Sequence, residues 1–522
     1  MPPEPPSPPS LDPGWFDTVV ETHISTLLFA GDYVYKRKKP VRFPFVDFST
    51  VERRRHACER EVELNRRFSP DVYLGVVDAP DEHGHPEPVV VMRRMASSQR
   101  LSTLVRTRSS AAGPCVAAVA ELVAGFHRHA PRSSVISQDA SAAAVMQLWD
   151  DSFNELEPFS GSVLDVDRLG EAARRARRFV GGREPLFERR ISDALVCDGH
   201  GDLQTDDVFC TPGGPRVLDC LEFDDHLRHV DVLADVAFLA MDLERLGAPE
   251  LAAQFVSIWA ASLNAPHALH NALLHHYVAQ RALVRCKVNC LRISTTNGGV
   301  GFPGAAQQAV GLLDLALAHL RAGTVRLVLV GGTPGVGKTT VAQALARATG
   351  WAVLHSDVVR RQLAGGSAAT PPPAEVRHGL YEPAAVAATY DEMRRRAGEL
   401  LGQGVSVILD ASWTSATQRQ QAVALAASGD ADLVSLRCVC DPTEAHRRIL
   451  ERSRTGLTGA SDATVEVAEL LAARADPWPH AVVLDTTATP PGDLVVQALE
   501  ASGGGSDPGV VWDWSAPGPS SR

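Results

Sequence analysis

The most informative segment of the C-terminal third of this chain is Gly332-Thr333-Pro334-Gly335-Val336-Gly337-Lys338-Thr339-Thr340. It fits the pattern G-x-x-x-x-G-K-T, in which backbone N–H groups of a glycine loop and of the helix after it hold a phosphate chain. We expect Lys338 to reach the β- and γ-phosphates and the Thr339 hydroxyl to bind Mg²⁺. A run that is apolar after Arg326, 326–330, precedes the loop, and a helical pattern follows it. This context predicts a site for ATP phosphates and Mg²⁺ at residues 332–340.

Strands and helices alternate around this loop from about residue 324 onward. The expected strands are 326–330, 352–355, 405–409 and 433–439, and the expected helices are 338–348 and 384–401. Such alternation is typical of a parallel sheet covered by helices. We therefore expect an α/β P-loop NTPase domain over residues 322–500, with its junction at 320–324.

Two acidic residues follow strands of this domain, at the edge where open α/β sheets bind ligands. Asp357 follows 352–355, and Asp410 follows 405–409. Asp410 could orient Mg²⁺ through a water molecule, and Asp357 could accept a proton from a substrate hydroxyl group. For each of them a helix N-cap is the alternative interpretation.

An arginine-rich run, 445–454, places Arg448 and Arg452 one helical turn apart. Their guanidinium groups could close over transferring phosphates, although a solvated helix face would look similar. With the glycine loop and 356–360, this run resembles the small-molecule kinases of the P-loop class, of the gluconate-kinase, chloramphenicol-phosphotransferase and zeta-toxin type. The resemblance covers about 325–490. Our catalytic candidates in this domain are Lys338, Asp357 and Arg452.

A loop with short strands interrupts a mostly helical pattern between about residues 100 and 320. It contains His200-Gly-Asp202, then Asp207 and then Asp219. Phosphoryl transfer to a hydroxyl group needs a carboxylate that faces the acceptor, together with acids that hold Mg²⁺. Two acidic turns without any chemistry are the alternative interpretation.

This loop resembles the catalytic and metal-binding loops of aminoglycoside phosphotransferases, which share the protein-kinase fold. The resemblance implies that Asp202 is the catalytic base and that Asp219 is a ligand of Mg²⁺. The family pattern has asparagine five residues after the base, whereas this chain has Asp207, whose carboxylate still offers oxygen to Mg²⁺. The departure leaves two interpretations open, an active enzyme and a pseudokinase.

Such a fold also needs a strand lysine for the α- and β-phosphates and a helix glutamate that holds this lysine. Lys36, in Val34-Tyr-Lys36, supplies the lysine, and Glu61 supplies the acid. Lys38, Lys39 and Glu59 lie close to them in the sequence and leave the choice open. A solvated basic strand is the alternative.

Three further features agree with this resemblance. Because the region has no GxGxxG pattern, residues 22–25 and the turn at Gly31 would have to cover the phosphates. We expect Asp231 to brace the catalytic loop. Arg281 and Arg285 lie one helical turn apart, where they could meet an anionic substrate or pair with acids.

The composition limits the kind of protein. The chain has 522 residues, 45% hydrophobic and 22% charged, as in a globular protein of two or three domains. Its net charge of -11 argues against a nucleic-acid partner. It has neither a stretch of roughly 20 apolar residues nor a signal-peptide core, so we expect a cytoplasmic protein without a membrane partner. We interpret the nine cysteines as buried thiols, because their spacing does not fit a zinc site.

Both halves together resemble a bacterial family of bifunctional aminoglycoside phosphotransferase/ATP-binding proteins. The resemblance is carried most clearly by residues 33–40, 47–50, 222–225 and 235–243. It implies an α+β protein-kinase-like (aminoglycoside phosphotransferase) domain before the P-loop domain. The expected bounds are 15–95 for its small lobe, 96–321 for its helical lobe, 322–500 for the P-loop domain, and 1–14 and 501–522 for disordered tails.

This organisation favours an ATP- and Mg²⁺-dependent phosphotransferase with two nucleotide sites that acts on small, hydroxyl-bearing, sugar-like molecules. The alternative is an ATP-driven switch, in which the first domain is a ligand-sensing pseudokinase and the P-loop domain only hydrolyses ATP. The expected partner is a small-molecule phosphoryl acceptor. The sequence leaves open both the identity of this acceptor and the oligomeric state.

Overall fold

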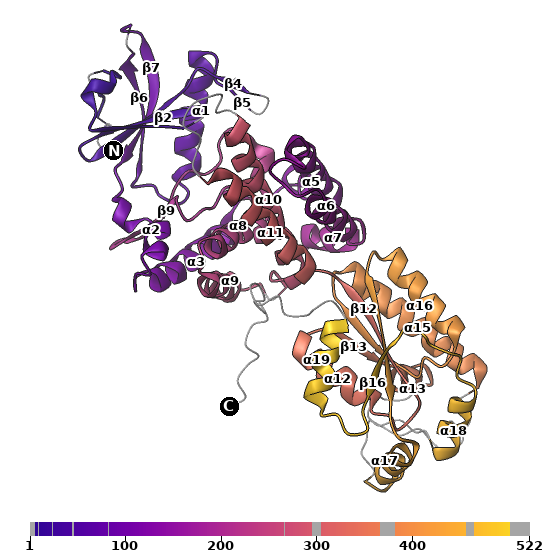
Figure 1. Ribbon diagram of the computed structural model, residues 1–522. Coiled ribbons are helices and arrows are strands. Elements are labelled where there is room, and N and C mark those ends of the chain that lie inside the picture. The colour runs from indigo at the N-terminus through magenta and orange to yellow at the C-terminus, as the bar shows by residue number, and fades with distance from the viewer. Residues whose placement is uncertain are drawn as a thin grey trace. The chain divides into compact units, whose positions relative to one another are not determined.

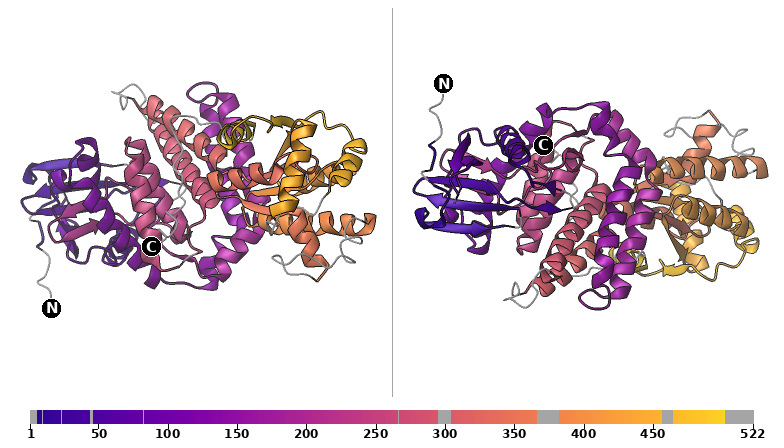
Figure 2. Two further views of the ribbon diagram at one scale, coloured as in Figure 1. Left: turned by 90° about the horizontal axis from the view of Figure 1, so that it is seen from below. Right: turned by 90° about the horizontal axis from the view of Figure 1, so that it is seen from above.

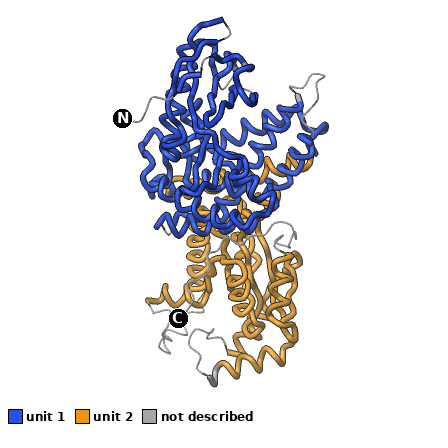
Figure 3. Tube along the Cα trace, turned by 90° about the vertical axis from the view of Figure 1, so that its left-hand side faces the viewer, with its two compact units in different colours: residues 1–165, 190–316, 516–522 blue, residues 166–189, 317–515 orange. Residues whose placement is uncertain are grey.

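The computed structural model describes residues 6–8, 10–22, 24–43, 46–81, 83–265, 267–294, 304–365, 382–455 and 464–501. The chain divides into two compact units, which Figure 3 shows in different colours. The described residues up to 165 and between 190 and 316 belong to unit 1, and those of 166–189 and from 317 to 501 belong to unit 2. No helix of the described ranges is long and apolar enough to cross a membrane.

Unit 1 begins with a five-stranded antiparallel sheet and one long helix (Figure 1). The strand order is β1 (Thr18–Glu21), β2 (Ser25–Ala30), β3 (Tyr33–Lys38), β7 (Pro86–Arg93) and β6 (Tyr73–Pro80). Helix α1 (Val51–Asn65) begins where the Thr50 side chain accepts the N–H of Arg53, and it packs Cys58 and Val62 against the sheet. A short antiparallel strand pair, β4 (Arg42–Phe43) and β5 (Val46–Asp47), precedes α1. The small sheet with one helix that we predicted is confirmed.

The N-terminal tail is partly described. The N–H of Leu11 donates to the carbonyl of Pro80 at 2.9 Å, and its side chain is buried with Leu28, Tyr35 and Ala79. Residues 1–5, 9 and 502–522, which belong to the tails expected to be disordered, lie outside the described residues.

The rest of unit 1 is mostly helical, with short strands between the helices. The helices are α2 (Leu101–Arg106), α3 (Ala112–His129), α4 (Ser134–Gln138), α5 (Ala142–Leu156), α8 (Val232–Arg245), α9 (Pro249–Leu263), α10 (Asn271–Ser294) and α11 (Ala305–Ala322), whose last residues belong to unit 2. The strands β9 (Val208–Thr211) and β10 (Gly214–Val217) form a hairpin, and β8 (Val196–Asp198) pairs with β11 (His229–Asp231). Helix α8 is buried from Val232 to Leu243, because it is apolar on almost every side. An antiparallel sheet with one helix, followed by a helical part that carries two short strand pairs, is the protein-kinase-like fold that we predicted.

Unit 2 contains five parallel strands covered by helices (Figures 1 and 2). The strand order is β13 (Ala352–His355), β14 (Val407–Asp410), β12 (Arg326–Gly331), β15 (Asp432–Val439) and β16 (Val482–Asp485). The helices are α12 (Lys338–Thr349), α13 (Ser356–Leu363), α15 (Pro383–Gly402), α16 (Ala416–Ser428), α17 (Pro442–Thr455), α18 (Val465–Ala473) and α19 (Pro491–Ala501). Every residue of the central strand β12 is buried, which explains its continuous apolar run. The predicted α/β P-loop class is confirmed.

Unit 2 also contains a segment from the middle of the chain. Helix α6 (Val166–Gly181) and the start of α7 (Glu184–Ser192) group with the parallel sheet (Figure 3). On α6, Glu171 accepts a hydrogen bond from Arg321 at 2.7 Å, and Arg178 lies 2.8 Å from Asp432. The domain boundary that we placed near residue 322 stays a prediction.

The interpretation of all nine cysteines as thiols is wrong for two of them. Cys115 on α3 and Cys210 on β9 form a disulfide, and the other seven cysteines are free. The two partners lie 95 residues apart in the sequence, so that their proximity depends on how α3 packs near the β9–β10 hairpin. Spacing along the chain therefore gave no signal for this pair.

Candidate active sites

The glycine loop of unit 2 lies between β12 and α12, as the sequence predicts. Gly332, Gly335 and Gly337 have φ values of 138°, 86° and 86°, which L side chains rarely adopt. Space excludes side chains as well: a Cβ at Gly332 would lie 2.5 Å from the carbonyl oxygen of Cys438, and one at Gly335 would lie 2.6 Å from that of Ala445. The loop therefore needs glycine at these positions to bring its backbone close to β15 and α17.

Lys338 and Thr339 open helix α12 directly after this loop. Lys338 Nζ donates to the carbonyl oxygen of Thr333 at 2.9 Å, so that its side chain folds back along the loop. Thr339 Oγ1 donates to Asp410 Oδ2 at 2.7 Å, and Thr340 beside it is exposed. The Thr339 hydroxyl group in the first turn of α12 and the Asp410 carboxylate at the end of β14 are in contact, and both offer the oxygen ligands that Mg²⁺ prefers. Pro334 and Val336, also in the predicted set, are buried within the loop.

Asp410 has a second partner that sequence reasoning missed. His355 ends β13 and pairs with Asp410 across the two parallel strands. Its Nδ1 lies 2.8 Å from Asp410 Oδ2, the same oxygen that accepts from Thr339. The signal was available, since His355 stands at the end of a predicted strand, two residues before Asp357. Asp410 ends β14 and does not cap a helix, because the N-cap of α16 is Ser415.

Asp357 lies in the first turn of α13. It is not the N-cap, a position that His355 occupies without a side-chain hydrogen bond. Instead, Asp357 Oδ1 accepts a hydrogen bond from Arg360 at 2.8 Å. An ion pair with a residue one turn later leaves Asp357 partly exposed, at 27% of its side chain. Its proposed role as a base stays a prediction.

The phosphate loop is supported from α17 and from the end of β16. Thr486 Oγ1 donates to the carbonyl oxygen of Val336 at 2.7 Å. Arg448 donates to Thr486 Oγ1 at 3.2 Å and to its carbonyl oxygen at 2.9 Å. Arg448, which is not among our catalytic candidates, thus contacts Thr486, the residue that holds the loop. Arg452 lies one turn later on α17 and is half-buried.

The predicted strand lysine of unit 1 lies in a cluster of opposite charges. Lys36 Nζ lies 2.7 Å from Glu61 Oε1 and 2.6 Å from Asp219 Oδ1. Lys38 Nζ lies 2.6 Å from Glu61 Oε2 and also pairs with Glu222. Although burial opposes its charge, Asp219 and Glu61 raise the pKa of Lys36 well above its usual value. Glu61 therefore joins both lysines, and Lys36 alone reaches Asp219.

The other neighbours named in the sequence lie elsewhere. Lys39 pairs with Glu21 at 2.9 Å, and Glu59 is exposed on α1. Thr22 follows β1, Ile24 precedes β2, and Ser25, the first residue of β2, pairs with Lys38 of β3. Gly31 lies at the opposite end of these strands, beyond the pair of Ala30 and Tyr33, and the expectation that its turn covers the phosphates stays a prediction. His23 lies outside the described residues.

The structure gathers Asp202, Asp207 and Asp219 near one another. The β9–β10 hairpin joins them, because the N–H of Leu218 donates to the carbonyl oxygen of Asp207 at 2.9 Å. Burial raises the pKa of Asp207 well above its usual value, and the charges of Asp219 and Asp202 raise it further. The charge of Lys36 lowers the pKa of Asp219, whose side chain is 47% exposed. Neighbouring acids with one raised pKa form a site that a divalent cation would stabilise.

Asp202 sits between acidic and basic groups. Burial raises its pKa to about 6, the charge of Asp219 raises it as well, and the charges of Arg285 and Arg281 lower it. Gln204 Nε2 donates to Asp202 Oδ1 at 2.7 Å. Both arginines thus lie close enough to act on this acid, and Arg281 also donates to the carbonyl oxygen of Ala234 at 3.3 Å. A carboxyl group with such a pKa is suited to accept a proton near neutral pH.

The sequence led us to expect Asp231 to brace the loop that carries Asp202. In the structure Asp235 braces this loop instead. Asp235 accepts the N–H groups of His200 at 2.7 Å and of Gly201 at 2.8 Å, and it lies 3.3 Å from His127 Nε2. Asp231 pairs with Arg190 and caps α8 by accepting the N–H of Leu233. Asp231 thus caps the start of α8, and Asp235, one helical turn later, accepts hydrogen bonds from the loop. Both were visible in the sequence, but only their place on α8 separates their roles.

Comparison with known proteins supports the assignment of unit 2 and shows the family. Residues 327–478 match a family model described as an AAA domain. Of the solved structures, a choline/ethanolamine kinase family protein from Mesorhizobium loti aligns at 13% identity and a TM-score of 0.36, over 59% of this chain and 94% of that one. A gluconokinase from Sinorhizobium meliloti 1021 aligns at 19% identity and a TM-score of 0.23, over 34% of this chain and 91% of that one. Likenesses this weak identify no activity.

Full-length relatives occur in mycobacteria. The chain is 42% identical over 474 residues to "Uncharacterized protein Rv2004c" of Mycobacterium tuberculosis (strain ATCC 25618 / H37Rv) and to "Uncharacterized protein Mb2027c" of Mycobacterium bovis. Each alignment covers 90% of this chain and 92% of the relative. Identity of this extent over both units means that the chain belongs to the same family as these two mycobacterial proteins.

Proposed function

We propose that the protein is an ATP- and Mg²⁺-dependent phosphotransferase with two nucleotide sites, one in each unit, acting on small hydroxyl-bearing molecules. One observation supports this most: each unit carries its own lysine and acid set for phosphoryl transfer. In unit 1, Lys36 contacts Glu61 and Asp219. In unit 2, Lys338 and Thr339 follow the glycine loop, and Thr339 contacts Asp410.

In unit 1, Asp202 takes the proton of the acceptor hydroxyl group. The hydroxyl oxygen forms a bond to the γ-phosphorus, the bond from this phosphorus to the bridging oxygen breaks, and ADP leaves. Asp207 and Asp219 would hold Mg²⁺, which when bound offsets the negative charge of the phosphates. Lys36, kept in place by Glu61, would bind the α- and β-phosphates.

In unit 2, the backbone N–H groups of Thr333 and of 335–338 bind the phosphates, and Lys338 contributes its charge. Thr339 and Asp410 would hold Mg²⁺, with His355 orienting the Asp410 carboxylate through its 2.8 Å contact. Asp357 accepts the proton of a second acceptor, while Arg448 and Arg452 supply positive charge from α17. Arg448 does so from a fixed place, because Glu444 and Thr486 hold its guanidinium group.

The test uses purified full-length protein, ATP labelled at the γ-phosphate and a mixture of sugar-like and other small hydroxyl compounds. Lys338→Ala and Asp202→Ala should each remove a separate part of the transfer, by about 100-fold or more at the site concerned. Arg347→Ala is the matched control for Lys338→Ala, because this exposed residue lies on the same helix, and Glu59→Ala, exposed on α1, is the control in unit 1. If neither Lys338→Ala nor Asp202→Ala changes ATP turnover, the proposal fails.

Asp207 favours a second candidate, the ATP-driven switch with a ligand-sensing unit 1. The pKa of Asp207 stands well above its usual value, because burial and the charges of Asp219 and Asp202 raise it, and the pattern of the family that this loop resembles has asparagine there. On this candidate, unit 2 hydrolyses ATP and label appears only as inorganic phosphate. Label on any small molecule in the Lys338→Ala variant contradicts the switch, because unit 1 must then have transferred it.

A further inference from the structure

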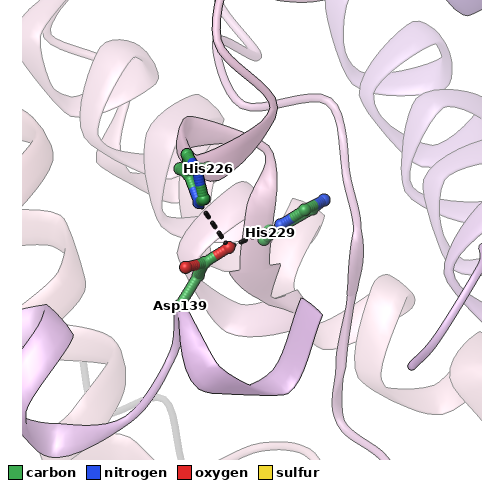
Figure 4. Close-up of side chains that lie close together, drawn as sticks. All are labelled: Asp139, His226 and His229. Atoms are coloured by element: carbon green, nitrogen blue, oxygen red, sulfur yellow. Dashed lines mark hydrogen bonds and ion pairs between the residues drawn. The ribbon is translucent and has the colours of Figure 1, made fainter. Parts of the chain in front are cut away.

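A cluster of two histidines and one aspartate lies in unit 1, outside the residues that we assign to phosphoryl transfer (Figure 4). Asp139 directly follows α4, His226 lies in the short 3-10 helix Asp225–Leu227, and His229 begins β11. The Nδ1 atoms of His226 and His229 lie 2.9 Å and 2.6 Å from the same oxygen, Asp139 Oδ2. We propose that these three side chains bind one divalent transition-metal cation, of which Zn²⁺ is the probe of choice.

The chemistry of the donors selects this class of cation. Two imidazole nitrogens and one carboxylate oxygen suit Zn²⁺ and related transition metals, whereas Mg²⁺ prefers oxygen ligands alone. The three ligand atoms lie within 4.8 Å of one another, and a cation between them needs distances of about 2.0–2.2 Å to each. A small outward rotation of the rings is enough. The cation then replaces the protons that face Asp139, which pass to solvent.

The backbone around the cluster is fixed before any cation binds. Arg228, between the two histidines, is fully buried and donates to Asp198 at 2.9 Å and to the carbonyl oxygen of Leu221 at 2.8 Å. His229 pairs with Asp198 across β11 and β8. Helix α4, which ends beside Asp139, packs against both of these strands. The donors therefore come from rigid neighbours, which lowers the entropic cost of ligation.

Two imidazoles on one carboxylate could also be a plain hydrogen-bonded triad. The exposure of His226 argues for the metal: 73% of its side chain is accessible, so that packing does not hold its ring over Asp139. The side chains of His229 and Asp139 are only 12% and 22% accessible, so the cluster is open to solvent on the side of His226. His226 also lines a cavity of about 1150 Å³ together with Asp224, Asp225 and residues of α1. The cavity provides an entry path and room for a water ligand.

A cation here would join α4 to the segment after Asp219. This segment contains Asp225, which pairs with Arg228 at 2.5 Å and with Arg60 of α1 at 3.4 Å. Cross-linking its end to Asp139 would stabilise the loop whose beginning carries Asp219. The expected consequence is a more stable unit 1, and this can be measured without any phosphotransferase activity.

The experiment uses full-length protein freed of metal with a chelator. Wild type should bind one Zn²⁺ per chain in a calorimetric titration with millimolar Mg²⁺ present, and its Tm should rise. Loss of a residue that only supports a metal ligand typically weakens metal binding by about 10- to 100-fold. His226→Ala and Asp139→Asn each remove a ligand itself, so we expect them to weaken Zn²⁺ binding by more than this. His83→Ala with His85→Ala is the matched control, because these two exposed histidines also lie beside an aspartate, Asp81.

Cobalt distinguishes this cluster from the free cysteines. Co²⁺ in wild type should show ligand-field bands without a thiolate charge-transfer band. His226 is exposed, so its replacement should leave the circular dichroism spectrum unchanged. The proposal is overturned if wild type binds less than one ion per chain, if His226→Ala and Asp139→Asn bind Zn²⁺ as tightly as wild type, or if the cobalt spectrum shows thiolate ligands.

Discussion

Asp202 is the residue whose charge state should control the unit 1 reaction. Burial raises its pKa to about 6, so the carboxylate is deprotonated above this pH and protonated below it. A base must be deprotonated to accept a proton, so transfer by the Lys338→Ala variant should fall as the pH is lowered through about 6. The measurement is the pH profile of label transfer. Arg285→Ala should move the midpoint upward, because the Arg285 charge lowers this pKa. A profile without a step near this pH would contradict the assignment of Asp202.

Thr486 allows a test of how the phosphate loop is positioned. Its hydroxyl group donates to Val336 in the loop and accepts from Arg448. Thr486→Val removes both hydrogen bonds, so we expect ATP affinity at unit 2 to fall by about tenfold and the unit to lose about 1 kcal/mol of stability. Binding of a fluorescent ATP analogue and thermal unfolding measure the two effects. Thr443→Val, on an exposed turn of α17, is the control, and equal affinities in both variants would show that Thr486 does not position the loop.

Sequence reasoning could find residues whose pattern is local, and it could not choose between residues of equal spacing. Lys338 and Thr339 follow from eight consecutive residues. Lys36 and Lys38 stand two apart on β3, so both face the same side and both reach Glu61. Lys39 lies one residue beyond β3 and pairs with Glu21 instead. The contact of Lys36 with Asp219 spans 183 residues and depends on the folded lobes alone.

The pairing of α3 with β9 gives a prediction about an element rather than a side chain. The disulfide of Cys115 and Cys210 ties α3 to the hairpin that follows Asp207. Replacing both cysteines by serine should lower the free energy of unfolding of unit 1 by about 2–4 kcal/mol, because the cross-link restricts the unfolded chain. Denaturant unfolding measures this effect. The denatured protein should expose seven thiols without reductant. After reduction of the disulfide it should expose nine. Nine thiols without reductant would contradict the disulfide.

The order of elements in unit 2 was predictable because strands and helices alternate at short range. The roles of Asp231 and Asp235 were not, because a difference of one helical turn decides which of them caps α8 and which accepts the N–H groups of His200 and Gly201. Such choices depend on where a helix begins, and this is the least certain part of any assignment from sequence. The position of α6 with unit 2 is a further case, since its partners lie more than 140 residues away in the chain.

The segment 166–189 implies that unit 2 is not a continuous piece of the chain. Arg183 is 1% exposed, and its guanidinium group donates to the carbonyl oxygens of Gly429 at 2.5 Å and of Asp430 at 3.3 Å. It also lies over the ring of Phe179. A charged donor that saturates two carbonyl groups in a buried place contributes more than a surface ion pair. A fragment that begins at residue 317 lacks this donor and should be less stable than unit 2 in the full chain.

Arg183→Ala tests this grouping in the whole protein. Removing the buried donor leaves both carbonyl groups without it, so the free energy of unfolding of unit 2 should fall by about 2–3 kcal/mol. The experiment is done in a protein that also carries Asp202→Ala and Lys36→Ala, so that ATP binds only to unit 2. Thermal unfolding with and without ATP then identifies the unfolding transition of unit 2, because ligand binding stabilises only the unit that contains the glycine loop. Arg174→Ala, exposed on the same α6, is the matched control. If the ATP-sensitive transition has the same Tm in Arg183→Ala and in Arg174→Ala, α6 and α7 contribute nothing to the stability of unit 2. The P-loop domain then begins near residue 322, as its sequence predicts.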